Sequence, residues 1–138
     1  MQGKKTISVI SGSQIYIKNI IMPKMKLSEL RQAVYYEATT FLPIPVEETV
    51  IDIFPLRNFE SETGTKTEVF FAAARREQVE NLEACCKIAR LDLSVVDLEP
   101  LAISRIIEKP EKIESFALLN IEDTRSIFSV FKGENLLF

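Results

Sequence analysis

The chain has 138 residues, of which 46% are apolar and 27% charged, with four Gly and six Pro. This length and composition predict one folded domain, or one domain with a trailing piece, and exclude a disordered chain. Seventeen Lys and Arg against twenty Asp and Glu give a net charge of −3, which provides no bulk attraction to nucleic acid or to anionic lipid.

The first half of the sequence predicts two strands and a helix. Alternating apolar residues indicate strands at 5–10 and 14–21, joined by a tight turn. A helix is predicted over 27–41, because its apolar residues recur every three or four positions. Pro43 and Pro45 end this helix, since proline removes a donor and favours extended backbone before it. The apolar stripe consists of Leu27, Leu30, Val34, Ala38 and Phe41.

The remainder predicts strands and two more helices. Strands are expected at 48–56 and 66–74, separated by a polar loop at 57–65; the second of them is apolar on both faces, which is typical of a central strand. Further along the chain we expect a helix at 77–89, a strand at 91–96, a helix at 99–108, and short strands at 116–121, 126–131 and 136–138.

The order of these elements indicates the fold class. From residue 14 to residue 96 it is strand, helix, strand, strand, helix, strand. This order predicts an α+β fold with a ferredoxin-like βαββαβ subdomain, in which two helices cover one face of a four-stranded antiparallel sheet. The third helix and last strands lie outside that subdomain, and the uncovered last strand favours strand exchange or edge pairing in a homodimer.

Few residues indicate chemistry. The sequence contains no His and no Gly-rich phosphate-binding motif, and its two cysteines, Cys85 and Cys86, are adjacent in a helical pattern, where thiols pack as small apolar groups. We therefore expect no enzyme activity, no metal and no cofactor. No apolar run reaches the roughly 18 residues of a membrane-spanning helix, so direct membrane insertion is not expected.

Three surface features are candidates for contacts. Glu37 has the wrong charge for the end of a helix, so it should have a partner, either a Lys or Arg of the fold or a group on another molecule. Arg75 and Arg76 open a helix, where they either form a solvated turn or serve a contact. Of the adjacent Tyr35 and Tyr36, one is expected to be exposed, which mildly favours a binding surface.

Three longer segments carry a family resemblance. They are MPKMKLSELRQAVYYEATTFLPIPVEETVIDI, EVFFAAARREQVENLEACCKIARLDLSVVDLEPLAISR and ALLNIEDTRSIFSV. In this order and spacing they resemble the PilM family, the actin-like cytoplasmic proteins of type IV pilus assembly. The resemblance extends from about Val9 to the end of the chain. Cell-division FtsA and the cytoplasmic domain of type II secretion GspL are relatives with the same architecture.

The resemblance implies a domain organisation. In this family a ferredoxin-like subdomain, 1C, is inserted into the first lobe of an actin-like, ribonuclease H-like fold. Residues 1–97 would hold that subdomain with a preceding strand. Residues 98–138 would hold a crossing helix and the incomplete beginning of the second lobe, so the chain resembles a fragment or a shortened relative.

The resemblance also implies a function. The chain would be a cytoplasmic protein-interaction module that binds an N-terminal peptide of the inner-membrane protein PilN, in a cleft between 1C and the first lobe. By this resemblance Glu37, Phe41 and Pro43 are the candidate partner-binding residues, although Phe41 also completes the predicted core stripe. The module would reach the inner membrane through this partner, and no nucleic-acid partner is expected.

The resemblance is incomplete at the nucleotide site. The chain has no counterpart of the family's first phosphate motif, and Asn120-Ile121-Glu122 stands where Asp-Ile-Gly is expected. Glu122 adds negative charge where a polyphosphate would lie, so we expect no measurable binding of ATP. Three alternatives stay open: a GspL-like scaffold, an actin-like nucleotide-hydrolysing protein, and a stand-alone ferredoxin-like domain that binds a small ligand.

Overall fold

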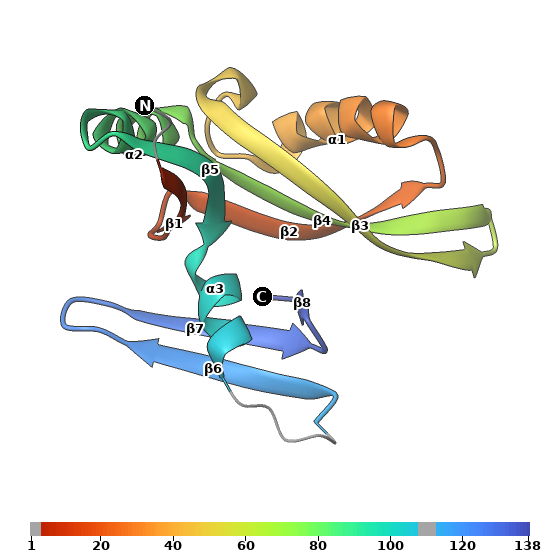
Figure 1. Ribbon diagram of the computed structural model, residues 1–138. Coiled ribbons are helices and arrows are strands. Elements are labelled where there is room, and N and C mark those ends of the chain that lie inside the picture. Colours follow the sequence, from red (N-terminus) through yellow and green to blue (C-terminus); the bar gives the residue numbers. More distant parts are fainter. Residues whose placement is uncertain (1–3, 108–112) are drawn as a thin grey trace. The chain divides into compact units, whose positions relative to one another are not determined.

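The computed structural model describes residues 4–107 and 113–138 and confirms the predicted α+β class (Figure 1). The described chain forms two compact units, one of residues 12–82 and one of residues up to 11 together with 83–138. None of the helices in the described part has the length and apolar character needed to cross a membrane. The elements are β1 (Lys4–Ile10), β2 (Ile15–Pro23), α1 (Leu27–Phe41), the short 3-10 helix η1 (Val46–Glu48), β3 (Thr49–Ser61), β4 (Gly64–Arg75), α2 (Arg76–Ile88), β5 (Leu91–Leu98), α3 (Glu99–Ile106), β6 (Ser115–Ile121), β7 (Ser126–Lys132) and β8 (Asn135–Leu136).

The unit of residues 12–82 is a sheet covered by a helix. β4 lies between β2 and β3 in an antiparallel sheet, as its two apolar faces predicted, and α1 covers one face (Figure 1). Helix α1 has the predicted bounds, and Leu30, Val34 and Ala38 of its stripe are buried, whereas Leu27 is exposed. The core between helix and sheet contains Ile20, Leu30, Val34, Ala38, Val46, Ile53, Val69, Phe71 and Ala73.

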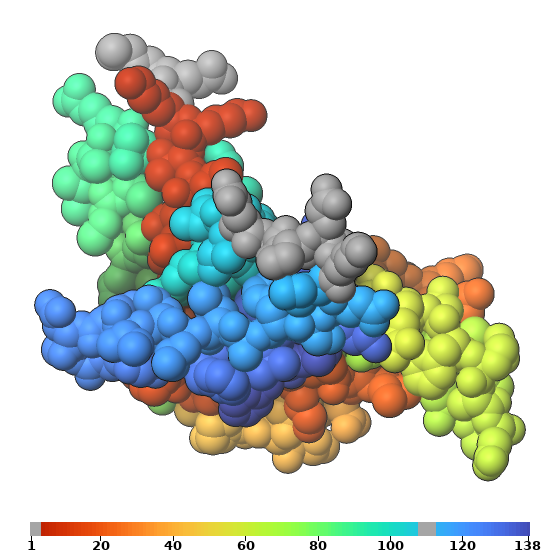
Figure 2. Space-filling view, turned by 90° about the horizontal axis from the view of Figure 1, so that it is seen from below, coloured from red at the N-terminus to blue at the C-terminus, as the bar shows by residue number. Residues whose placement is uncertain are grey.

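The segment predicted as a polar loop at 57–65 belongs instead to a long hairpin. β3 continues to Ser61 and β4 begins at Gly64. Polar side chains pair across the two strands, as in the 2.6 Å ion pair between Arg57 Nε and Glu68 Oε2. Gly64 has a φ of 106°, which the short turn requires and which residues other than glycine rarely adopt. The tip of the hairpin, yellow-green in Figure 2, projects from the surface. Because its strands are exposed to solvent there, polar side chains can occupy them.

The predicted four-stranded ferredoxin-like sheet is corrected to three strands. β5 does not join β2, β3 and β4; it pairs with β1 in a separate two-stranded parallel sheet. Ile10 lies opposite Leu98 in this pair and both are buried, so burial of apolar surface stabilises the pairing of β5 with the N-terminal strand. The division of the chain into 1–97 and 98–138 stays a prediction.

In the second unit, α3 follows β5 directly, and β6, β7 and β8 form an antiparallel sheet in that order. The rings of Phe116 and Phe131 stack with centroids 4.8 Å apart. The chain stays beside β7 after β8, because the Val130 amide donates to the Phe138 carbonyl at 2.7 Å. The predicted end of the third helix, residue 108, lies outside the described residues.

Candidate functional site

The C-terminal end of α1 leads into a proline-rich loop. The Leu42 amide donates to the Ala38 carbonyl at 2.9 Å, which is the last helical hydrogen bond, and Leu42 itself is extended. Pro43 and Pro45 then carry the chain to η1. Because proline has a fixed φ and no N–H, this loop has few alternative conformations. Pro43 is exposed at its start.

The two arginines at the β4–α2 junction hold the far end of this loop. Arg76 donates from Nη2 to the Thr49 carbonyl at 2.7 Å and from Nε to the Glu47 carbonyl at 3.2 Å. Arg75 Nη1 lies 3.6 Å from Glu48 Oε2. The arginines therefore serve contacts within the fold, and Arg76 fixes the backbone that follows the proline-rich loop.

Phe41 belongs partly to the core and partly to the surface. Its ring meets the buried Phe71 edge to face, with centroids 5.1 Å apart at 81°. The ammonium of Lys18 on β2 lies 4.1 Å from the centroid of the Phe41 ring, which is the geometry of a cation–π contact. Phe41 thus completes the core stripe, and the Lys18 side chain covers its remaining face.

Glu37 lies one turn before Phe41, on the same side of α1, and is exposed. No basic residue occupies the last turn of α1, and no salt bridge within residues 4–107 and 113–138 includes Glu37. Of the two partners expected for Glu37, the described fold does not supply the first, a Lys or Arg. A group on another molecule stays a prediction, as do the partner contacts of Glu37, Phe41 and Pro43.

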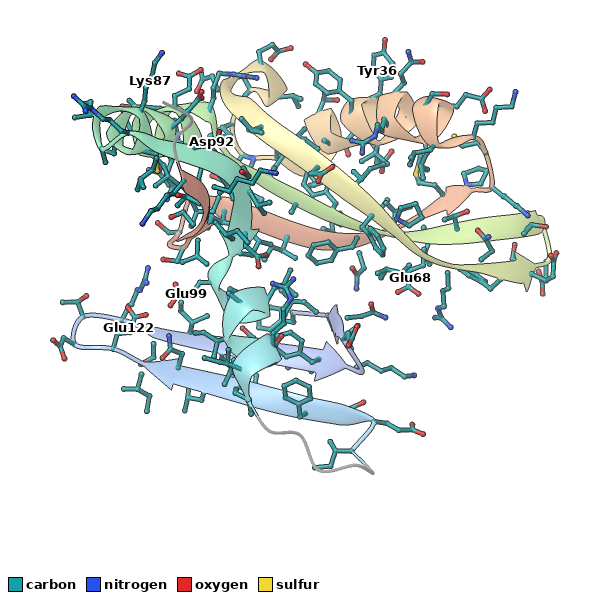
Figure 3. All side chains as sticks on the ribbon, in the orientation of Figure 1. Tyr36, Glu68, Lys87, Asp92, Glu99 and Glu122 are labelled. Carbon is teal, nitrogen blue, oxygen red and sulfur yellow. The ribbon has the colours of Figure 1, made fainter. Side chains whose placement is uncertain are left out.

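Asn120 and Glu122, which the resemblance placed at a phosphate-binding turn, lie in the other unit and belong to a polar cluster with Glu99 and Arg125. Figure 3 labels Glu99 and Glu122. Arg125 donates from Nε to Glu122 Oε2 at 2.5 Å and from Nη2 to Glu99 Oε2 at 3.0 Å. The amide of Asn120 donates to Glu99 Oε1 at 3.1 Å and to Glu122 Oε1 at 3.0 Å. The hydrogen bond from Arg125 lowers the pKa of the Glu122 carboxyl, and the same bond raises the pKa of Arg125.

The hydrogen-bond donors of this cluster, on Asn120 and Arg125, are bonded to its own carboxylates. Two carboxylates, Glu99 and Glu122, accept from the one guanidinium and the one amide, so the group carries a net negative charge. A phosphate placed there would have to displace a carboxylate from Arg125 and would meet the remaining negative charge. The family resemblance drew attention to Asn120 and Glu122, whereas the contacts of Glu99 and Arg125 with them were not predicted. The signal available for Arg125 was its position three residues after Glu122, across a hairpin turn.

The described residues contain no group of three or more His, Cys, Asp or Glu arranged to hold a metal ion. A hollow of about 420 Å³ beside α3 is lined by Leu101, Ser104, Arg105, Ile107 and Glu134. Two of its polar side chains already have partners: Ser104 Oγ donates to the Leu101 carbonyl, and Arg105 pairs with Asp97. The hollow therefore offers few groups to orient a ligand.

Two comparisons with known proteins agree with each other. The model of a family described as type IV pilus assembly protein PilM matches residues 2–138. A solved structure described as a "PilM-PilN type IV pilus biogenesis complex" is similar over 100% of this chain, with 27% sequence identity and a TM-score of 0.79. The chain covers 42% of that relative's length.

Proposed function

Because the family match extends over residues 2–138, the chain belongs to the PilM family of type IV pilus assembly proteins, and we propose that it is a protein-interaction module that binds a PilN-like peptide. The observation that carries the proposal is the similarity of the whole chain to a protein solved as a PilM-PilN complex. The PilN-like partner would be an inner-membrane protein, and the module would act at the cytoplasmic face of that membrane through it.

The surface at the end of α1 supports this proposal. Binding to a surface that is already rigid costs less conformational entropy. The two prolines and Arg76 restrict the backbone that follows α1 in this way. Phe41 and Pro43 offer apolar area, and Glu37 offers a carboxylate. An extended peptide can combine such anchors with backbone pairing along a sheet edge.

The two edge strands of the sheet differ in their capacity for backbone pairing. β3 contains Pro55 and, directly after it, a β-bulge. Both features hinder backbone pairing with another strand. β2 has regular pairing with β4 from Ile15 to Pro23 and carries Lys18, whose ammonium lies over Phe41. A peptide along β2 would therefore run beside the candidate anchors.

The enzymatic alternative has less support. We propose that this chain binds no ATP, because Arg125 and Asn120 already donate to Glu99 and Glu122. The stand-alone ferredoxin-like alternative loses its main basis, since β5 is absent from the sheet. The family match favours the pilus over the GspL-like scaffold.

Calorimetric titration tests the proposal. The chain is titrated with the N-terminal peptide of the PilN-like protein encoded in the same genome, with a scrambled peptide of equal composition, and with Mg-ATP. We expect heat from the native peptide alone, and weaker binding by the Pro43→Gly and Glu37→Gln variants. Equal binding of both peptides would contradict specific docking, and binding of Mg-ATP would contradict our interpretation of Asn120 and Glu122.

A further inference from the structure

One flank of α1 combines an aromatic ring, a small residue and a carboxylate. We define the α1 flank as Ala33, Tyr36, Glu37 and Thr40. Residues three and four apart on a helix are neighbours, so Ala33 lies beside both Tyr36 and Glu37, and Thr40 lies beside the same two residues. Tyr36 is 73% exposed, and Figure 3 shows its side chain pointing away from the sheet. The short side chain of Ala33 leaves room between its larger neighbours.

The α1 flank is less polar than its sequence suggests. The hydroxyl of Thr40 donates to the Glu37 carbonyl at 2.7 Å, and the hydroxyl of Thr39 donates to the Tyr36 carbonyl at 2.7 Å. Both hydroxyl protons are therefore already used in hydrogen bonds to the helix backbone. Tyr35 meets Tyr36 edge to face with centroids 6.3 Å apart, and this contact restricts the Tyr36 ring.

The charge of the flank is uncompensated. Arg31 is the one basic residue of α1, and it pairs with Asp52 of β3 at 3.2 Å. Glu37 is six positions after Arg31, which places the two residues about 120° apart around the helix. Lys18 lies over the Phe41 ring and makes no salt bridge with Glu37 within the described residues. Glu37 also lies near the negative end of the helix dipole.

We propose that the α1 flank binds a Lys or Arg side chain of the partner segment, with the cation between the Tyr36 ring and the Glu37 carboxylate. A cation is favoured there for three reasons: the carboxylate lacks one, the helix end attracts one, and an exposed tyrosine face binds one. The inference rests on the proposed function, because it assigns a charge to the segment that reaches Glu37.

A second copy of the chain is a poorer occupant than a basic segment. In a symmetric pairing of two α1 flanks, each surface meets its own copy. The two Glu37 carboxylates would then approach each other, and the pairing would supply no cation to either. Like charges in close contact are destabilising, so the charge of the flank selects a partner of opposite charge.

The experiment uses the ¹⁵N-labelled chain and two short acetylated, amidated peptides. One peptide has arginine between two leucines, and the other has citrulline, which keeps the shape of arginine and removes its charge. We expect the arginine peptide to shift the amide resonances of Ala33, Tyr36, Glu37 and Thr40, and the citrulline peptide to bind about two- to five-fold more weakly, as the range for an exposed ion pair implies.

Variants separate the ring from the charge. Glu37→Gln and Tyr36→Leu should each weaken the arginine peptide about two- to five-fold, and Tyr36→Phe should retain binding because it keeps the ring. Glu62→Gln, at the tip of the β3–β4 hairpin, is the matched control for loss of one carboxylate and should change nothing. Circular dichroism of each variant verifies that the fold is kept.

Three results would overturn the inference: no binding of the arginine peptide, equal binding of both peptides, or an effect of Glu62→Gln as large as that of Glu37→Gln. The calorimetric titration with the PilN-like peptide is a separate measurement. Failure of that titration with success of the arginine peptide would reject the proposed function and keep the basic-segment site. The reverse pattern would reject this inference alone.

Discussion

Truncation of Arg76 tests whether the β4–α2 junction holds the proline-rich loop. In the Arg76→Ala variant, the carbonyls of Thr49 and Glu47 lose their guanidinium donor, at 2.7 and 3.2 Å. Hydrogen bonds from charged donors contribute about 1.5–3 kcal/mol each when buried. Arg76 is exposed and water can reach the Glu47 carbonyl, so we expect a loss of about 1–2 kcal/mol in total.

Arg75→Ala is the matched control, because it removes the same charge one residue earlier. Its pair with Glu48 is longer, 3.6 Å, and both side chains are partly exposed, so we expect a loss of less than about 1 kcal/mol. Urea unfolding followed by circular dichroism gives the free energy of unfolding for both variants. If Arg75→Ala destabilises the chain as much as Arg76→Ala, the conclusion that Arg76 fixes the backbone after the proline-rich loop is wrong.

Three further predictions concern stability. Val34→Ala removes two buried carbon atoms from the core and should lower the free energy of unfolding by about 2–3 kcal/mol in urea; a loss below that of exposed Leu27→Ala would contradict the packing. Gly64→Ala places a β-carbon on a backbone with positive φ and should cost about 1 kcal/mol, measured the same way, whereas no loss would mean the turn differs. The pKa of Glu122 is lowered in the folded chain, so the folded state binds fewer protons than the unfolded state and stability falls as pH falls through the acidic range; the difference in melting temperature between the native chain and Arg125→Gln should shrink from pH 7 to pH 3, and a constant difference would refute the pairing.

Regular local patterns made part of the fold predictable. The stripe of Leu30, Val34 and Ala38 made α1 predictable, because apolar residues that recur every three or four positions indicate a helix with one buried face. Apolar residues on both faces of β4 likewise identified the central strand. The end of the β3–β4 hairpin was missed for the complementary reason: Arg57 and Glu68 stabilise exposed strands by pairing with each other, and such residues are also common in loops.

Long-range pairing was not predictable from these patterns. The apolar alternation of β5 fits either a sheet with β2 and β4 or a pair with β1, and only the observed contact of Ile10 with Leu98 decides between them. The polar cluster around Glu122 was likewise not predictable, because it depends on contacts between residues far apart in the sequence. Glu99 opens α3 and Arg125 follows a hairpin turn, so their approach depends on how α3 packs on β6 and β7.

The most direct test of the account locates the peptide on the chain. The PilN-like peptide carries a nitroxide label at one end, and the amide spectrum of the ¹⁵N-labelled chain is recorded with the label oxidised and then reduced. The account predicts that the oxidised label broadens amides near Lys18 and from Glu37 to Leu42, the last amide before Pro43, more than any others. Broadening confined to the β6–β7 sheet, or none at all with saturating peptide, would contradict docking at the end of α1.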